Sequence, residues 1–174
     1  MCILHRPTSK SNELTTKEYN EAVDSLADGL YRFAAKKCND RNLAKDIVQD
    51  AFAKLWVTKN NVDGNKVKSY LFTSVNRLVI DYWRKSRRLT DMESVNHNPT
   101  ETNQEYSNLK EILNKELKKL PEMQRTVLLL RDYESFSYAE IGLITDLSEA
   151  QVKVYIYRGR KALKTRLEKL NIVA

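Results

Sequence analysis

The chain has 174 residues, 41% of them hydrophobic, which is enough to bury the core of one or two small domains. Thirty Lys and Arg residues against 23 Asp and Glu residues give a net charge of +7, which favours a polyanionic partner. No apolar run approaches the roughly 20 residues of a membrane span, and residues 1–14 lack the apolar stretch of a signal peptide. We therefore expect a cytoplasmic location and no stable membrane insertion.

The cysteines and histidines do not form a recognisable site. Neither histidine has a Cys, Asp or Glu cluster at ligand spacing, so we expect no metal. Cys38 is expected to fill space near a helix end, and Cys2 to remain a free thiol. The sequence holds no P-loop, no GxGxxG and no evident Ser, His and acid constellation. We therefore expect no cofactor and no catalytic site, and an enzyme is the least favoured class.

The first half of the chain predicts three amphipathic helices. Thr15 and Glu18 have the spacing of a capping box, which opens a helix that runs to about Lys37. A second helix is predicted over residues 43–59, and a third over residues 66–88. The third helix is apolar around much of its circumference, so it is expected to contact more than one partner helix. It ends in four basic residues: Arg84, Lys85, Arg87 and Arg88.

A change of composition divides the chain into two. Residues 91–105 hold four acidic residues, no basic residue and no hydrophobic period, which indicates a flexible linker. We therefore predict an all-α fold with an N-terminal tail (1–14), a helical domain (15–90), the linker (91–105) and a second helical domain (106–174). The second domain is predicted to begin with amphipathic helices over residues 105–120 and 121–133.

The C-terminal part of the second domain predicts a helix-turn-helix. Ser137 with Glu140 and Ser148 with Gln151 have capping-box spacing, and the two starts lie eleven residues apart. On a helical wheel, the last helix has a packing face formed by Val152, Ile156, Gly159, Leu163, Leu167 and Leu170. The opposite face carries Ala150, Lys153, Val154, Tyr157, Lys161 and Lys164, with Gln151 and Arg158 at its edge. The alternative is an amphipathic helix whose charged face is only solvated. The excess of basic residues in a helix that follows a helix-turn-helix signature favours DNA binding instead.

Several motifs occur in a fixed order across the two domains. They are residues 46–56 (DIVQDAFAKLW), 69–72 (SYLF), 80–84 (IDYWR), 120–125 (LPEMQR), 138–141 (YAEI) and 148–154 (SEAQVKV). In this order the chain resembles an extracytoplasmic-function (ECF) sigma factor of the bacterial sigma-70 family, over nearly its whole length.

The resemblance implies a division of labour between the domains. The N-terminal domain would bind the β′ coiled coil of core RNA polymerase and melt the promoter −10 element. The C-terminal domain would bind the β flap and read the −35 element, and the linker would thread toward the RNA exit path. An anti-sigma protein is a further expected partner, although nothing in the sequence identifies it.

The resemblance also suggests which residues carry these roles. The predicted polymerase-binding residues are Asp46, Gln49, Asp50 and Trp56, where a solvated acidic face is the alternative; Phe52 and Leu55 are expected in the core. The predicted −10 residues are Asn61, Val62, Asn65, Lys66, Asn76, Arg77, Arg84, Lys85, Arg87 and Arg88. The predicted −35 residues are Gln151, Lys153, Val154, Tyr157, Arg158 and Lys161.

Two questions stay open at this point. The family often has Asn where this chain has Arg77, and here Asn76 precedes it, so the residue that closes the −10 base pocket is not fixed. Tyr82 is expected in the core rather than stacked on a base. The sequence leaves two other classes of function: a helix-turn-helix regulator with no polymerase role, and a helical RNA-binding or adaptor protein.

Overall fold

The computed structural model describes residues 14–90 and 108–170, and within these ranges the chain forms helices and turns but no strand. The sequence interpretations of Cys2, His5, His97 and the linker lie outside the described residues. The α-helices are α1 (Thr16–Cys38), α2 (Arg41–Thr58), α3 (Val67–Thr90), α4 (Asn108–Lys118), α5 (Glu122–Leu128), α6 (Tyr138–Thr145) and α7 (Glu149–Lys169). None of the helices in these ranges is both long and apolar enough to cross a membrane.

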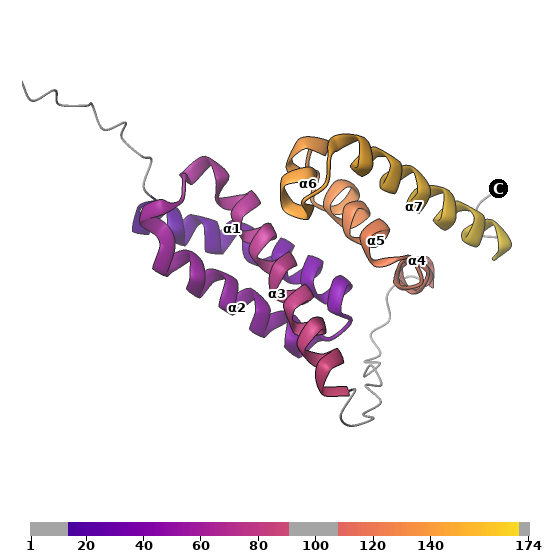
Figure 1. Ribbon diagram of the computed structural model, residues 1–174, viewed down its shortest axis with the longest axis horizontal. Helices are drawn as coiled ribbons and strands as arrows, with labels where there is room; N and C mark the ends of the chain where they lie inside the picture. The colour runs from indigo at the N-terminus through magenta and orange to yellow at the C-terminus, as the bar shows by residue number, and fades with distance from the viewer. Residues whose placement is uncertain (1–13, 91–107, 171–174) are drawn as a thin grey trace, which may run out of the picture.

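The first three helices pack against one another as a bundle, each in contact with the other two (Figure 1). α1 begins at the predicted capping box, because the Thr15 hydroxyl accepts from the Glu18 N–H and the Glu18 carboxylate accepts from the Thr15 N–H. α2 begins two residues earlier than predicted, because the Asp40 carboxylate caps the N–H groups of Asn42 and Leu43. As expected, Phe52 and Leu55 are buried in the core of this bundle.

The C-terminal helices form the second unit of the fold. α5 continues from Leu129 to Tyr133 as a π-helical segment, so the predicted single helix has one irregular turn. α7 packs along α5, and Gly159 permits the close approach, because a Cβ there would lie 2.8 Å from Leu128 Cδ1. Both predicted capping boxes form, at Ser137 and at Ser148, so the helix-turn-helix of α6 and α7 is confirmed.

The two units are in direct contact with each other. α6 packs on α3, and the two helices lie side by side in Figure 1. Phe136, just before α6, is buried against Phe72 of α3 with ring centroids 4.9 Å apart, and Phe72 in turn lies 5.5 Å from Phe33 of α1. Each aromatic pair of this kind contributes on the order of 1 kcal/mol beyond the burial of its rings. The apolar core is therefore continuous across the boundary between the two units.

Candidate nucleic-acid and partner interfaces

The outward face of α7 is laid out as the helical wheel predicts. Val152, Ile156 and Gly159 are buried against the rest of the unit. The exposed side chains include all six predicted −35 residues: Gln151, Lys153, Val154, Tyr157, Arg158 and Lys161. Leu170 was expected to pack, but it is half-exposed at the end of the helix, where it lines an open hollow with Glu116 and Lys119.

The first turn of α7 holds one of these side chains in place. The Gln151 carbonyl oxygen accepts from the Ser148 N–H at 2.9 Å and from the Ser148 hydroxyl at 3.0 Å. The amide NH₂ group of Gln151 is thus the part that can donate to a base edge. Lys153 Nζ lies 5.7 Å from the Tyr138 ring, which Arg131 also contacts, at 4.8 Å. Two cation–π contacts to the Tyr138 ring thus link the start of α7 to α6 and to the π-helical segment.

Arg160 is a functional candidate that the wheel did not single out. Its Nη2 donates to Asp132 Oδ1 at 2.5 Å, and this hydrogen bond raises the pKa of the guanidinium. Asp132 lies in the π-helical segment after α5, so the pair joins α7 to the first half of the unit. Arg160 is therefore a positioning residue for α7 rather than a base-reading one.

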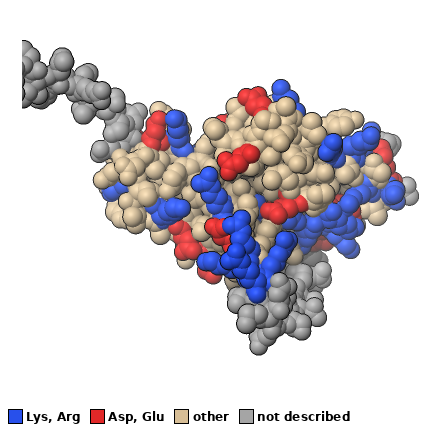
Figure 2. All heavy atoms as spheres, in the orientation of Figure 1, with Lys and Arg blue, Asp and Glu red and all other residues tan. Residues whose placement is uncertain are grey.

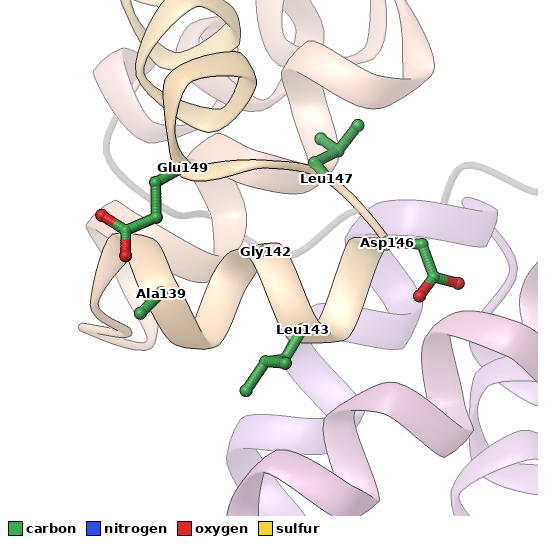
Figure 3. A pocket seen from close by; sticks show the side chains of 6 residues that line it. All are labelled: Ala139, Gly142, Leu143, Asp146, Leu147 and Glu149. Carbon is green, nitrogen blue, oxygen red and sulfur yellow. The ribbon is translucent and has the colours of Figure 1, made fainter.

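The turn between α6 and α7 is tight and partly open to solvent. Asp146 adopts the left-handed conformation with φ 57°, and a Cβ on Gly142 would lie 2.6 Å from the Leu147 carbonyl oxygen. Residues of α6 and the turn line a shallow hollow, from which the Leu143 side chain projects (Figure 3). Asp146 is among the residues that line it, and its carboxylate lies 4.0 Å from Arg77 Nη2 of α3.

The loop before α3 presents three of the predicted −10 side chains to solvent. Asn61, Asn65 and Lys66 are exposed, and the Asp63 carboxylate holds the turn by accepting from the Asn65 N–H at 3.0 Å. Val62 differs, because its side chain is only 7% exposed and belongs to the core. The side chain of Val62 is therefore not available to a nucleic-acid strand.

The C-terminal half of α3 carries the strongest positive patch in view. Arg84, Lys85, Arg87 and Arg88 are exposed, and Figure 2 shows Lys and Arg side chains gathered over this end of the helix. Arg84 Nη1 lies 3.6 Å from Asp81 Oδ1, so its charge is partly balanced. The expectation for Tyr82 was wrong: its side chain is 38% exposed, because the neighbouring Trp83 faces the core instead.

The two candidates for closing the −10 base pocket have different environments. Asn76 is 5% exposed, accepts from the Lys37 ammonium and donates from Nδ2 to the Ile144 carbonyl oxygen at 3.2 Å. Arg77 is exposed but is paired with Asp146. Both side chains therefore contact the helix-turn-helix of the same chain.

The predicted polymerase face of α2 is open. Asp46, Gln49 and Asp50 are exposed, and Trp56 is 44% exposed at the far end of the same face. The Trp56 ring is held by an edge-on contact with Tyr19 at 4.9 Å and by Lys59 Nζ at 3.7 Å. A rigid aromatic ring beside carboxylates is a suitable anchor for a partner helix.

Comparisons with known proteins agree with this two-part organisation. Residues 22–89 match the family described as Sigma-70 region 2, and residues 110–163 match Sigma-70, region 4. The chain is 28% identical to the ECF RNA polymerase sigma factor SigM of Bacillus subtilis, with 83% of this chain and 92% of the relative covered. It is 29% identical to SigW of the same organism, an ECF RNA polymerase sigma factor, with 87% and 90% covered. The chain belongs to the ECF group of the sigma-70 family.

The fold of this sigma factor also matches that of solved structures. It superposes with a TM-score of 0.79 on the sigma factor RpoE of Bartonella quintana, solved in complex with the anti-sigma factor NepR, at 22% identity. That match covers 88% of this chain and 98% of the other. CnrH, solved with the cytosolic domain of CnrY, gives a TM-score of 0.68 at 20% identity, with 92% and 94% covered. In this sigma factor, region 2 comprises α1–α3, and region 4 comprises α4–α7.

Sequence reasoning missed the residues that join region 2 to region 4. These residues are Lys37, Glu122, Glu134 and Asp146, in addition to Asn76 and Arg77. Lys37 carries one local signal, because a Lys at position 37 lies one turn after Phe33 on the apolar stripe of the first helix. The others have no such signal, because each pairs with a residue far away in the sequence.

Proposed function

We propose that this chain binds core RNA polymerase, brings it to specific promoters and melts the −10 element, and that it acts by binding rather than by catalysing a reaction. The observation that carries the proposal is the capped helix-turn-helix, whose α7 presents exposed base-reading and phosphate-binding side chains. A helix-turn-helix regulator would share this feature. Such a regulator would leave the exposed face of α2 and the basic end of α3 without a partner. A role in complex with polymerase gives a partner to both surfaces, namely polymerase for α2 and the −10 strand for α3.

At the −35 element, α7 is proposed to enter the major groove with its N-terminal half. Gln151, Lys153, Val154, Tyr157 and Arg158 lie on this half and are exposed. Amide and guanidinium groups can donate to base edges, and a valine methyl can contact a thymine methyl. Lys161 lies farther along the helix, where a phosphate is the expected ligand.

At the −10 element, region 2 is proposed to hold a single strand against α3. The exposed basic residues at the end of α3 would meet phosphates, and the loop before α3 would receive an unstacked base. Asn61, Asn65 and Lys66 offer donors and acceptors there. Tyr82, which is more exposed than expected, adds a ring on which a base can stack.

The polymerase contact is assigned to Asp46, Gln49, Asp50 and Trp56 of α2. These side chains form one exposed face around a fixed aromatic ring. A helix of the β′ coiled coil is the proposed partner, and region 4 is proposed to bind the β flap. Because the similar fold of RpoE was solved in complex with the anti-sigma factor NepR, and that of CnrH with the cytosolic domain of CnrY, we also propose a dedicated anti-sigma partner for this chain.

Transcription in vitro with core polymerase and a library of random promoter sequences tests the proposal. The expected result is transcripts that depend on this chain and start downstream of one shared pair of sequence elements. If the chain bound a specific duplex but never directed polymerase to it, the helix-turn-helix regulator would be the correct function. If it required no duplex sequence at all, the RNA-binding or adaptor class would be favoured.

A further inference from the structure

The ammonium of Lys153 on α7 is directed toward the neighbouring helix α6. Glu149 lies four positions before Lys153, a spacing at which a Glu and a Lys on one helix commonly pair. The Glu149 carboxylate instead lies at the hollow formed by α6 and the turn, near Ala139 (Figure 3). The Lys153 ammonium lies 5.7 Å from the centroid of the Tyr138 ring, and within residues 14–90 and 108–170 it makes no ion pair. The direction of this exposed lysine is therefore set by a residue of another helix.

The Tyr138 ring is itself well held. Tyr138 is the first residue of α6 and packs, half-buried, against the hydrophobic core. Arg131 Cζ lies 4.8 Å from the ring centroid, and Arg131 Nη1 is fixed because it donates to the Phe136 carbonyl oxygen at 2.7 Å. The pKa of the Arg160 guanidinium is raised, mainly by its hydrogen bond to Asp132 and to a smaller extent by the Tyr138 side chain, so Arg160 also lies near the ring. The ring thus has fixed neighbours in the π-helical segment and in α7.

The restriction of Lys153 matters because a free lysine discriminates poorly between bases. Its ammonium is a point charge on a flexible four-carbon stem, which can reach several phosphates and base edges. A cation held over an aromatic face has fewer positions to lose on binding, and its N–H donors remain able to form hydrogen bonds. Part of the entropy loss that accompanies binding has thus already occurred in the folded chain.

Both edges of the outward face of α7 are organised in the absence of DNA, by different contacts. On one edge, Gln151 is fixed by its two capping hydrogen bonds. On the other edge, Lys153 is directed by Tyr138. Val154 and Tyr157 lie between these edges and are exposed. A face with an oriented donor at each edge is suited to reading base pairs in addition to binding phosphates.

We propose that Tyr138 positions Lys153 for one base pair of the −35 element, so that a residue of α6 sets part of the sequence preference of α7. This inference rests on the proposed function. Because the ammonium can only donate, the base it selects must offer acceptors at its major-groove edge, and guanine offers O6 and N7 side by side. Tyr138 touches no base in this arrangement and is a positioning residue that acts through Lys153.

Four variants of the full-length chain, each assembled with core polymerase, separate this role from a general role in stability. Tyr138→Leu removes the ring and keeps an apolar side chain against the core. Tyr138→Phe is the matched control, because it keeps the ring and removes only the hydroxyl group. Lys153→Ala removes the ammonium, and the fourth variant combines Tyr138→Leu with Lys153→Ala. Thermal unfolding shows that each variant is folded at the temperature of the binding measurement, and Tyr138→Met replaces Tyr138→Leu if the latter is unfolded.

The first readout is a binding selection over promoters in which the −35 hexamer is randomised and the −10 element is fixed. Lys153→Ala should lose a preference for guanine at one position. Tyr138→Leu should weaken the preference at that same position by about two- to fivefold, the range expected of an exposed cation–π contact. The double variant should resemble Lys153→Ala, because Tyr138 acts only through Lys153, and Tyr138→Phe should keep the wild-type preference. Equal weakening of all hexamers by Tyr138→Leu, or a change at a different position, would overturn the inference.

The second readout follows Lys153 without DNA, by NMR of full-length chains whose lysines carry isotope-labelled dimethyl groups. The signal of Lys153 is identified by its loss in Lys153→Ala. The ring current of residue 138 should displace this signal from those of other exposed lysines in the wild type and in Tyr138→Phe, and the displacement should vanish in Tyr138→Leu. A signal that is the same in all three proteins would overturn the inference.

The two readouts also distinguish this inference from the proposed function. If the wild type selects a −35 hexamer but the variants do not behave as described, the proposed function stands and only the role of Tyr138 is lost. If the wild type selects no hexamer at all, the −35 function fails and the inference fails with it.

Discussion

Lys37 Nζ, buried at the end of α1, lies 3.6 Å from Glu122 Oε1 at the start of α5, 85 positions later in the chain. Burial lowers the pKa of this ammonium to about 8, and the Glu122 carboxylate opposes the shift. The pair therefore joins region 2 to region 4, and the protonation of Lys37 can be measured through the pH dependence of stability.

The pKa of Lys37 predicts a pH dependence of stability. Between pH 8 and the ordinary lysine pKa of 10.5, the unfolded chain keeps the Lys37 proton while the folded chain releases it. The unfolded state then binds more protons, so this residue makes the free energy of unfolding rise with pH, by at most about 1.4 kcal/mol per unit. Urea unfolding at pH 7.5 to 9.5 measures it for the wild type and for Lys37→Met.

The comparison with Lys37→Met isolates one residue from the other groups that titrate when both proteins carry Cys38→Ala, because burial raises the pKa of the Cys38 thiol and that thiol interacts with Lys37. Tyr133 acts in the opposite direction, because burial raises its pKa above 10 in the folded chain. Its contribution is common to both proteins and cancels in the difference. If wild type and Lys37→Met showed the same slope over this range, Lys37 would not be buried as described.

Gly142→Ala should destabilise the helix-turn-helix. The added Cβ would lie 2.6 Å from the Leu147 carbonyl oxygen, which is backbone and cannot swing aside. Forced overpacking of this kind costs about 1–3 kcal/mol, which exceeds the roughly 1 kcal/mol that alanine gains in helix propensity. Chemical denaturation measures the change. The control is Gly64→Ala, where the nearest atom would be 3.5 Å away, and an equal effect of both changes would contradict the tight turn.

Base readout and phosphate contact on α7 can be separated by mutation. Lys153→Ala or Arg158→Ala should change which −35 sequences are preferred, because each base contact contributes about 1–3 kcal/mol of discrimination. Lys164→Ala should only weaken binding, because Lys164 lies two to three turns farther along and is paired with Glu168 at 3.6 Å. Selection over randomised −35 hexamers measures the preference. A changed hexamer for Lys164→Ala alone would mean that α7 enters the groove in another register.

The basic end of α3 should set the salt dependence of −10 binding. Removing a charge that contacts a phosphate flattens the log–log slope of affinity against salt by about 0.7 for a single strand. Lys85→Ala should show this full effect. Arg84→Ala should show a smaller one, because Asp81 already lies 3.6 Å from Arg84. Titration of a −10 oligonucleotide at several salt concentrations measures the slope for each variant. A larger change of slope for Arg84→Ala than for Lys85→Ala would contradict this prediction.

Features set by neighbouring residues in the sequence were predictable. The capping boxes at Thr15, Ser137 and Ser148 depend only on local spacing, and all three are present. Of the predicted packing stripe of α7, the first half is buried, at Val152, Ile156 and Gly159. Tyr82 and Leu170 were misjudged, because a helical wheel shows which side chains share a face but not whether another helix covers that face.

Contacts between the two regions could not be predicted from one sequence. Asn76 has the polarity of a strand-binding residue, yet it is buried because α6, nearly 70 positions later, packs over it. Glu134 would be read as a solvated loop residue, but Gly29 and Arg32 of α1 receive it. Interactions of this range depend on how the regions dock, which local periodicity does not encode.

The most direct test of the account is promoter opening by core RNA polymerase with and without this chain. On a promoter selected in vitro, the wild type should make −10 thymines reactive to permanganate, and core polymerase alone should not. Asp50→Lys with Trp56→Ala should abolish that reactivity by preventing polymerase binding, because both exposed residues lie on the proposed polymerase face of α2. Absence of reactive thymines with the wild type, or full reactivity with the double variant, would contradict the account.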